Sequence, residues 1–303
     1  MKSNNKSKSI VLDKDVSTDI LKSKKLAIIG YGNQGRAQAL NLKDSSFDVC
    51  VGLREDSQSN LIVKDDGLLH LTIKETVSSC DILSILIPDN SIAEVWKAYI
   101  LPYLKKGQTV LFSHGYNVHY KLINIPEHIN VIMVAPSGAG SEVRKQYKNG
   151  RGVPGLIAVH QDYTGNSFDI SLSYSKAIGL TRLGVFKSTF KEETETDLFG
   201  EQAILTGGIP KLIQSSYKVL LESGYSPMTA WFVCYYEIKT IVDLFHSKGF
   251  EFMNQAISDT AEYGGITRGN RIIDKHVRDE MRNALKEIQS GEFHKEWMKE
   301  TKD

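Results

Sequence analysis

Short runs of apolar residues, rich in valine and isoleucine, recur from Leu26 to about Thr189. They read LAIIG, FDVCVG, DILSILIP, TVLFSHG, INVIMVAP, VPGLIAVH and LTRLGVF. The runs are apolar on both faces, and segments with a helical pattern separate them, which is typical of a parallel sheet that helices cover on both sides. The pattern predicts a doubly wound α/β domain over residues 21–189.

After Thr189 the strand pattern stops, and helical patterns follow over residues 195–207, 209–223, 226–248, 254–263 and 271–290. We therefore expect an all-α domain over residues 190–303. The segment SPMTAWFVCYYEIKTIVDLF is apolar nearly all round, which predicts burial in its own domain or against another subunit. Glu237 lies within it and must be paired or bind metal, because a lone buried charge costs several kcal/mol.

The composition limits the number of domains, the classes of partner and the cellular compartment. The 303 residues suffice for about two domains, and 37 basic against 36 acidic residues give a net charge of +1. This balance favours neither nucleic acid nor an anionic membrane as a partner. Cys50, Cys80 and Cys234 have no metal-binding spacing, which suits the cytoplasm. The N-terminus contains no apolar signal segment, and we expect residues 1–20 to form a mobile tail.

The first apolar run leads into a glycine-rich turn and then a helical pattern. The turn consists of Gly30, Tyr31, Gly32, Asn33, Gln34 and Gly35. Between a strand and a helix, such glycines permit a tight turn and let a pyrophosphate approach the helix N-terminus. The turn predicts a dinucleotide site; the alternative is a glycine-rich turn without a ligand.

The second apolar run ends about 20 residues after this turn, where the ribose 2′ position of a dinucleotide lies. Arg54, Ser57 and Ser59 stand there and offer a guanidinium and two hydroxyls to a 2′-phosphate. These residues favour NADPH as the cofactor. Glu55 and Asp56, in the same loop, are an argument for NADH.

Two later runs end in the candidate site residues His114 and Ser137. Ligands of doubly wound sheets bind outside the carboxyl ends of the strands, so both residues are expected to face the cofactor crevice. A lone histidine is more often structural, but its place at a strand end favours a functional role for His114.

An acidic run, FKEETETDLFGEQ, opens the second half of the chain. Asp197 and Glu201 stand four residues apart, which on a helix puts both carboxylates on one face. A hard divalent cation such as Mg²⁺ would relieve their repulsion. The alternative is a solvated acidic N-terminus that the helix dipole favours.

The motifs together resemble those of short-type ketol-acid reductoisomerases, in register from about Lys24 to Trp297. They are IIGYGNQGRAQALNL, VGLREDSQS, SHGYN, GRGVPGLIAVHQD, FKEETETDLFGEQAIL, ISDTAEYG and EIQSGEF. The resemblance implies a Mg²⁺-dependent alkyl migration in a 2-acetolactate-type substrate, followed by hydride transfer from a nicotinamide cofactor. It also implies a knotted, all-helical C-terminal domain and a homodimer, or an assembly of dimers, in which the partner subunit completes each active site.

The resemblance also assigns roles to single residues. Asp197 corresponds to the carboxylate that bridges two Mg²⁺ ions, and Glu201 to a ligand of one of them. Glu237 corresponds to the second of two helix glutamates that reach in from the partner subunit. Ser258 corresponds to the serine that binds the substrate carboxylate, and His114 to the active-site histidine.

This chain departs from the family pattern on the substrate side. Val233 stands where the family has the first helix glutamate, and Tyr236 where it has a histidine. Ser137 replaces the family's active-site lysine, with Ala139 and Ser141 in place of the proline and histidine that follow. Neither valine nor serine can hold a metal or support developing charge as the family's residues do.

These departures favour an NADPH- and Mg²⁺-dependent enzyme that acts on a different 2-oxo or 2-hydroxy acid in a specialised pathway. Three alternatives stay open: the ordinary conversion of 2-acetolactate to 2,3-dihydroxyisovalerate in branched-chain amino acid synthesis, a cyclisation or skeletal rearrangement without net reduction in secondary metabolism, and a non-catalytic cofactor-binding scaffold. The retained cofactor and metal residues argue against the last.

Overall fold

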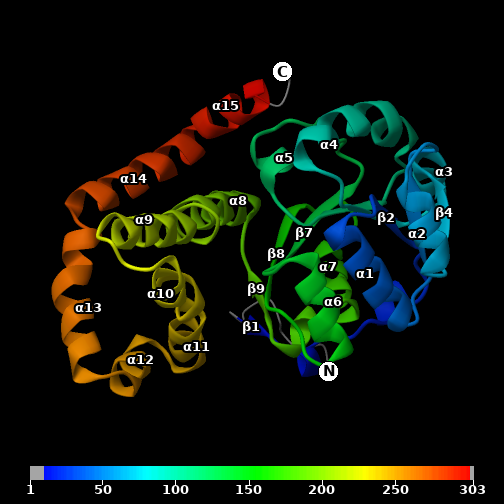
Figure 1. Cartoon of the computed structure of the whole chain (residues 1–303). Helices are drawn as coiled ribbons and strands as arrows, with labels where there is room; N and C mark the ends of the chain where they lie inside the picture. Colours follow the sequence, from blue (N-terminus) through cyan, green and yellow to red (C-terminus); the bar gives the residue numbers. More distant parts are fainter. Residues whose placement is uncertain (1–9, 301–303) are drawn as a thin grey trace. The chain divides into compact units, whose positions relative to one another are not determined.

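A computed structural model describes residues 10–300 of the chain (Figure 1). The chain consists of two compact units; the first ends at Thr194 and the second begins at Glu195. The sequence places this boundary after Thr189. The first unit is an α/β domain and the second is helical, so the predicted fold class is confirmed.

A nine-stranded sheet runs through the described part of the first unit, in the order β1-β9-β8-β7-β6-β5-β2-β3-β4. The strands are β1 (Ile10–Val11), β2 (Leu26–Ile29), β3 (Val49–Leu53), β4 (Leu69–Thr72), β5 (Ile82–Ile85), β6 (Thr109–Phe112), β7 (Asn130–Pro136), β8 (Gly155–Gln161) and β9 (Val185–Lys187). Strands β2 to β7 are mutually parallel, as predicted. The chain runs outward from β2 through β3 and β4, then returns to place β5 on the other side of β2.

Successive residues of each strand point to opposite faces, so each face has its own core. Leu26 and Ile28 belong to one core and Ala27 and Ile29 to the other. The first core packs against α1 (Asn33–Asp44), α6 (Gly140–Lys148) and α7 (Ser167–Ala177); α2 (Ser59–Asp65) contributes Val63. The second packs against α3 (Ile73–Ser79), α4 (Asp89–Val95), the π-helical η4 (Trp96–Ile100) and α5 (Tyr116–His119).

The sheet differs from the prediction in the direction of β8 and β9 and in the strands β1 and β4, which the prediction lacked. β8 pairs antiparallel with β7, although its run is as apolar as the parallel ones. An apolar run reads the same in either chain direction, so the sequence does not fix the orientation of β8. In the structure its first half is buried, whereas Val159 is exposed. The edge strand β4 was missed, because its residues are exposed or half-buried and form no apolar run.

The expectation of a mobile tail over residues 1–20 is wrong for residues 10–20; residues 1–9 lie outside the described part. Strand β1 pairs antiparallel with β9, and two short 3-10 turns, η2 (Asp13–Asp15) and η3 (Asp19–Leu21), follow it. Val11, Val16 and Leu21 are buried in the first core. The Lys176 ammonium donates to the backbone carbonyls of Asp13 (2.7 Å) and Val16 (2.8 Å), which ties this segment to α7.

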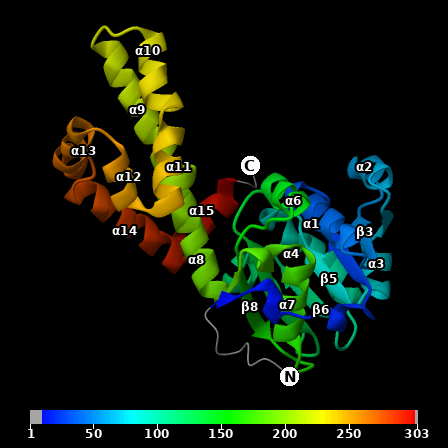
Figure 2. The same cartoon turned by 90° about the horizontal axis from the view of Figure 1, so that it is seen from below.

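Helix α8 (Phe190–Gly200) leads from the first unit into the second. The second unit then comprises the π-helical η7 (Glu201–Leu205), α9 (Gly208–Glu222), α10 (Pro227–Trp231), the π-helical η8 (Phe232–Tyr236), α11 (Ile238–Lys248), α12 (Phe250–Ala256), α13 (Asp259–Ile272), α14 (Lys275–Ser290) and α15 (Glu292–Glu300). Helix α9 lies beside α10 (Figure 2). It also contacts η8, where the rings of Tyr217 and Tyr235 meet edge to face at 5.6 Å. The predicted knot stays a prediction.

The long apolar segment forms α10, η8 and α11, but it is not buried within this chain. Trp231, Phe232 and Val233 are each more than two fifths exposed, and Glu237 is exposed as well. The expectation that the segment buries itself in its own domain is therefore wrong. Packing against another subunit, the alternative, stays a prediction. Within residues 10–300, no helix has both the length and the apolar content needed to span a bilayer.

Candidate functional site

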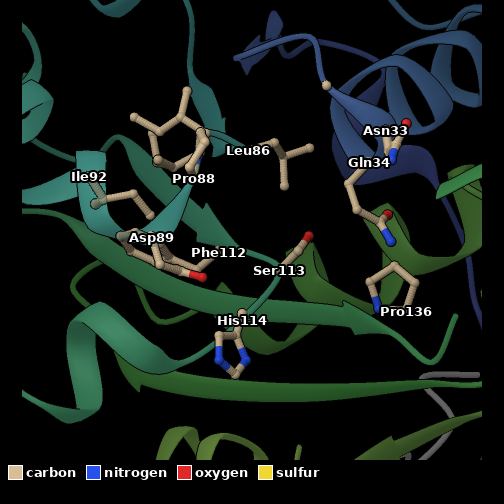
Figure 3. A pocket seen from close by; sticks show the side chains of 13 residues that line it. Asn33, Gln34, Leu86, Pro88, Asp89, Ile92, Phe112, Ser113, His114 and Pro136 are labelled. Atoms are coloured by element: carbon tan, nitrogen blue, oxygen red, sulfur yellow. The ribbon is translucent and has the colours of Figure 1, made fainter. Parts of the chain in front are cut away.

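A cavity of about 310 Å³ lies where the strand order reverses, between the carboxyl ends of β2 and β5. Doubly wound sheets bind their ligands at this point, because the flanking connections diverge to opposite faces and leave a crevice. Its lining includes Gly32, Gln34, Leu86, Phe112, Ser113 and His114 (Figure 3). The structure thus brings the glycine turn and His114 together at the predicted crevice.

The three glycines of the turn serve three different purposes. Gly30 has φ +99°, and a Cβ there would meet the Leu86 carbonyl oxygen at 2.5 Å. A Cβ at Gly35 would meet the Gly30 carbonyl oxygen at 2.3 Å, so this glycine lets α1 pack closely on β2. A Cβ at Gly32 would meet no described atom within 4 Å. The backbone is therefore open to a ligand at Gly32, the N-cap of α1, as a pyrophosphate site requires.

The side chain of Tyr31, a predicted cofactor contact, is turned away from the crevice. It is 6% exposed, and its hydroxyl donates to Asp66 Oδ2 at 2.8 Å. Arg36 donates to both oxygens of the same carboxylate at 2.7 and 2.9 Å. Burial and the hydrogen bond to Asp66 raise the pKa of the Tyr31 hydroxyl. Only the backbone of Tyr31 is left for a ligand at the turn.

A second cavity, of about 620 Å³, lies beyond the end of β3 and is lined by Arg54, Lys74 and Tyr99 among others. The Arg54 side chain is 68% exposed, and its Nε lies 3.8 Å from Asp56 Oδ1. Ser57 and Ser59 are half-buried beside it, and Ser57 Oγ accepts from the Ser59 amide at 3.3 Å. Two cations, Arg54 and Lys74, therefore line this cavity together with aromatic rings and the carboxylates of Glu55 and Asp56.

His114 is held by a buried carboxylate at the carboxyl end of β6. Its Nδ1 lies 2.9 Å from Glu193 Oε1, and the Gly115 amide donates to Glu193 Oε2 at 2.7 Å. A Cβ at Gly115 would meet Thr194 Oγ1 at 2.5 Å, so the glycine allows α8 to approach this strand end. An ionised carboxylate only accepts hydrogen bonds. Opposite an ionised Glu193, Nδ1 is therefore the nitrogen that carries the proton of this hydrogen bond.

Asp197 lies one helical turn beyond Glu193 on α8. Ligand atoms of His114, Glu193 and Asp197 all lie within 4.8 Å of one another. Glu193 is 4% exposed, whereas Asp197 is exposed. Glu193 is engaged by His114 and the Gly115 amide, so Asp197 is the member of this group whose carboxylate oxygens suit Mg²⁺, which prefers oxygen ligands.

The remaining candidate residues are not members of this group of three. Glu201 begins the π-helical η7 and Val233 lies in the π-helical η8; both are exposed. Such π-helical turns often mark functional sites. Ser258 is the N-cap of α13, where its hydroxyl accepts from the Ala261 amide at 3.3 Å. Ser137 is exposed just after β7, whereas its neighbour Pro136 lines the crevice.

Sequence reasoning missed two residues of these sites. Glu193 stands four residues before Asp197, so the helical spacing that paired Asp197 with Glu201 could have found it. Lys74 lies in α3, after the unpredicted strand β4, and only the folded chain brings it beside Arg54.

Comparisons with known proteins agree with this geometry. Residues 20–184 match the family model for the acetohydroxy acid isomeroreductase NADPH-binding domain. Residues 190–303 match the model for the ketol-acid reductoisomerase C-terminal domain. Both matched regions fall close to the predicted division of the chain.

Single proteins give the same result. The NADP(+) ketol-acid reductoisomerases of Methanocaldococcus jannaschii and Pyrococcus abyssi are 52% and 50% identical over 289 residues, which is 95% of this chain and 87% of each relative. The solved structure of an NADH-preferring ketol-acid reductoisomerase from an uncultured archaeon matches with a TM-score of 0.94 at 42% identity, over 97% of this chain and 91% of that one. The predicted resemblance is confirmed, as is the expectation of an enzyme, and the chain belongs to the ketol-acid reductoisomerase family.

Proposed function

We propose that this protein catalyses the ordinary ketol-acid reductoisomerase reaction, from 2-acetolactate to 2,3-dihydroxyisovalerate, with NADPH and Mg²⁺. One observation carries the proposal: the chain matches NADP(+) ketol-acid reductoisomerases at about half of its positions across both units. These relatives support the ordinary reaction better than the specialised substrate that Ser137 and Val233 led us to expect.

The two cavities of the first unit suit the two ends of NADPH. The open backbone at Gly32 would accept the pyrophosphate, and the crevice beside Phe112 the nicotinamide ring. Arg54 and Lys74 would face the 2′-phosphate in the second cavity. Among solved relatives, one prefers NADH, so cofactor preference varies within the family and has to be measured here.

Mg²⁺ would be held by Asp197 and Glu201, with Glu237 supplied by a partner subunit. The fit rests on the exposed Asp197 carboxylate close to Glu193 and His114. When bound, Mg²⁺ supplies Lewis-acid polarisation of the substrate oxygens. Glu193 would hold the Nδ1 proton of His114 and so fix the tautomer and orientation of an imidazole that lines the crevice.

The assembly would be a homodimer or a set of dimers. Apolar residues are exposed throughout the second unit, and α10 and η8 carry a cluster of Trp231, Phe232 and Tyr236 rings. Exposed aromatic clusters mark protein interfaces. A second copy is the partner that the family resemblance implies, and the cytoplasm remains its expected location.

A specialised 2-oxo or 2-hydroxy acid substrate is the second candidate, and the departures at Ser137 and Val233 favour it. Serine lacks the fixed positive charge that supports a developing alkoxide, an interaction worth about 10²–10³ in rate. With valine in place of a glutamate, the second metal ion would lose a ligand. Both losses would slow the alkyl migration more than they would slow the simple reduction of a 2-oxo acid.

The deciding experiment compares 2-acetolactate with a panel of 2-oxo acids, at saturating NADPH and Mg²⁺, by following NADPH oxidation. Turnover of 2-acetolactate at about 1 s⁻¹ or faster supports the main proposal. Reduction of 2-oxo acids alone would select the second candidate. In that case Ser137→Lys combined with Val233→Glu should raise 2-acetolactate turnover more than the product of the single changes. Turnover of neither class would reject both.

The cofactor proposal has its own test. NADPH should bind about 10-fold or more tightly than NADH, because a charge-assisted cluster faces the 2′-phosphate. The variants Arg54→Gln and Lys74→Gln should each lower the ratio of NADPH affinity to NADH affinity. The matched control Lys64→Gln, on the neighbouring α2, should leave it unchanged. Equal affinities for the two cofactors in the unmodified protein would contradict the assignment.

A further inference from the structure

A chain of buried hydrogen bonds runs beneath the crevice. The Tyr174 hydroxyl, on α7, donates to Gln38 Oε1 at 2.8 Å, and Gln38 Nε2, on α1, donates to Ser113 Oγ at 3.0 Å. Tyr174 and Gln38 are both 0% exposed. Buried polar groups need partners, so the orientation of each group constrains the next.

The donor and acceptor roles along these hydrogen bonds follow from the Gly138 carbonyl, where the series begins. A backbone carbonyl only accepts hydrogen bonds, so Gln34 must turn its Nε2 toward the Gly138 oxygen, 2.8 Å away. Gln34 Oε1 then accepts from Gln38 Nε2 at 3.3 Å. The Gln38 amide oxygen is left facing Tyr174, whose hydroxyl keeps its proton because burial raises its pKa. Ser84 Oγ lies 3.2 Å from the same hydroxyl, farther than Gln38 Oε1 at 2.8 Å.

These orientations determine whether the Ser113 hydroxyl donates or accepts. Gln38 Nε2 has a second hydrogen, and the Ser113 oxygen accepts it. Among the described residues, Gln38 is the hydrogen-bond partner of this hydroxyl, so the Ser113 proton is available to a ligand. Figure 3 shows the Ser113 side chain directed into the space between Leu86 and Gln34.

The walls of the crevice indicate which ligand atom receives that proton. Leu86, Pro88 and Phe112 form apolar sides that suit a flat, uncharged ring beside the glycine turn. The polar substituent of a nicotinamide ring is its carboxamide, whose oxygen accepts. A neutral donor at Ser113 matches it without adding charge to the site.

We propose that Ser113 donates a hydrogen bond to the nicotinamide carboxamide oxygen, and that Gln38 and Tyr174 are positioning residues that orient the Ser113 hydroxyl. This inference rests on the proposed cofactor site and adds the residue that recognises the reactive end of the cofactor. It requires no particular substrate.

The first test is Ser113→Ala, studied by titrating the intact protein with NADPH and with 2′-phospho-ADP-ribose, which lacks the nicotinamide. NADPH should bind about 5-fold more weakly, as expected for one neutral hydrogen bond. The affinity for 2′-phospho-ADP-ribose should stay unchanged, which also shows that the variant is folded. Unchanged NADPH affinity, or an equal loss for both ligands, would overturn the proposal.

The second test is Tyr174→Phe, which keeps the ring and removes only the hydroxyl. Without this hydroxyl, Gln38 keeps its hydrogen bond to Gln34 but loses the partner of its oxygen, so its Nε2 is held less firmly against Ser113. NADPH should bind about 2- to 5-fold more weakly, while 2′-phospho-ADP-ribose binds as before. Ser175→Ala removes a buried hydroxyl of the same helix that bonds only within that helix, so it is the matched control.

The double variant separates positioning from general damage. If Tyr174 acts through Ser113, adding Tyr174→Phe to Ser113→Ala should cause no further loss of NADPH affinity. A full additional loss, or no effect of Tyr174→Phe alone, would overturn the positioning role. These titrations need no turnover, so they remain decisive even if the 2-acetolactate assay rejects the proposed function.

Discussion

The two units of this protein differ in where they keep their apolar side chains. The first unit buries them in two cores, one on each face of its sheet. In residues 195–300 of the second unit, the buried apolar side chains are Leu198, Ala230 and Ile288. Of the twenty-eight large apolar side chains that are exposed among residues 10–300, eighteen lie in this second stretch, although it is the shorter of the two.

The difference shows that the units obtain their stability from different sources. A unit with its own core is stable at any protein concentration. Helices with exposed apolar faces gain most of their stability from tertiary packing, and these helices have little of it within one chain. Association with a second copy would supply that packing and make the stability of the second unit depend on protein concentration.

The largest expected effect comes from placing a charge on the exposed aromatic cluster. Trp231→Glu should weaken association by about 100-fold, because an aromatic anchor at an interface is worth about 2–4 kcal/mol. Turnover should fall with it, since the proposed partner completes the site. Sedimentation at micromolar concentration measures the assembly.

The matched control for this change lies in the first unit. Leu61, on α2, is 73% exposed, and Leu61→Glu should leave both assembly and turnover unchanged. A stable, active monomer of the Trp231→Glu variant would show that the second unit, like the first, is stable without a partner.

A smaller effect, confined to catalysis, is expected from Glu193→Gln. An amide can still accept from the Gly115 amide, but it holds the Nδ1 proton of His114 less firmly than a carboxylate does. We expect turnover to fall by about 10²-fold with NADPH affinity and assembly unchanged. Glu192→Gln, at the exposed neighbouring position, should behave as the unmodified protein does. Loss of assembly in Glu193→Gln would mean that this carboxylate is structural.

The sequence predicted best what local pattern determines. Apolar runs located seven strands, and the glycines between Gly30 and Gly35 located the crevice, because close approach and a positive φ at Gly30 admit only glycine. The direction of β8 and β9 could not be predicted, since an apolar run carries no directional signal. The order of the N-terminal segment could not be predicted, because single buried residues such as Val16 form no periodic apolar run.

The candidate site was predictable where residues act at strand ends and unpredictable where they act through contacts across the fold. His114 follows a strand, and its position could be inferred from that. Its partner Glu193, and the link from Tyr174 through Gln38 to Ser113, join residues far apart in the chain. The sequence left open whether its own domain or a partner buries the segment around Glu237, because an apolar helix looks the same in both cases; the structure excludes burial within one chain.

The smallest expected effect tests the self-contained stability of the first unit. Asp66 accepts from Arg36 and Tyr31, and the hydrogen bonds from Arg36 lower the pKa of its carboxyl group. A carboxyl whose folded pKa lies below its unfolded value, about 3.9, stabilises the fold above that pH. This stabilisation is lost as the pH falls through the folded pKa.

Arg36→Met should therefore lower the free energy of unfolding by about 1 kcal/mol at pH 7, a small value because the Arg36 side chain is 53% exposed. The deficit should shrink below about pH 4, where Asp66 becomes protonated in the unfolded chain. Urea unfolding followed by Trp96, the tryptophan of the first unit, in a Trp231→Phe and Trp297→Phe background, measures this unit alone. Lys22→Met breaks an exposed pair with Asp19 and should change nothing. If the deficit depended on protein concentration, the first unit would share the second unit's reliance on a partner.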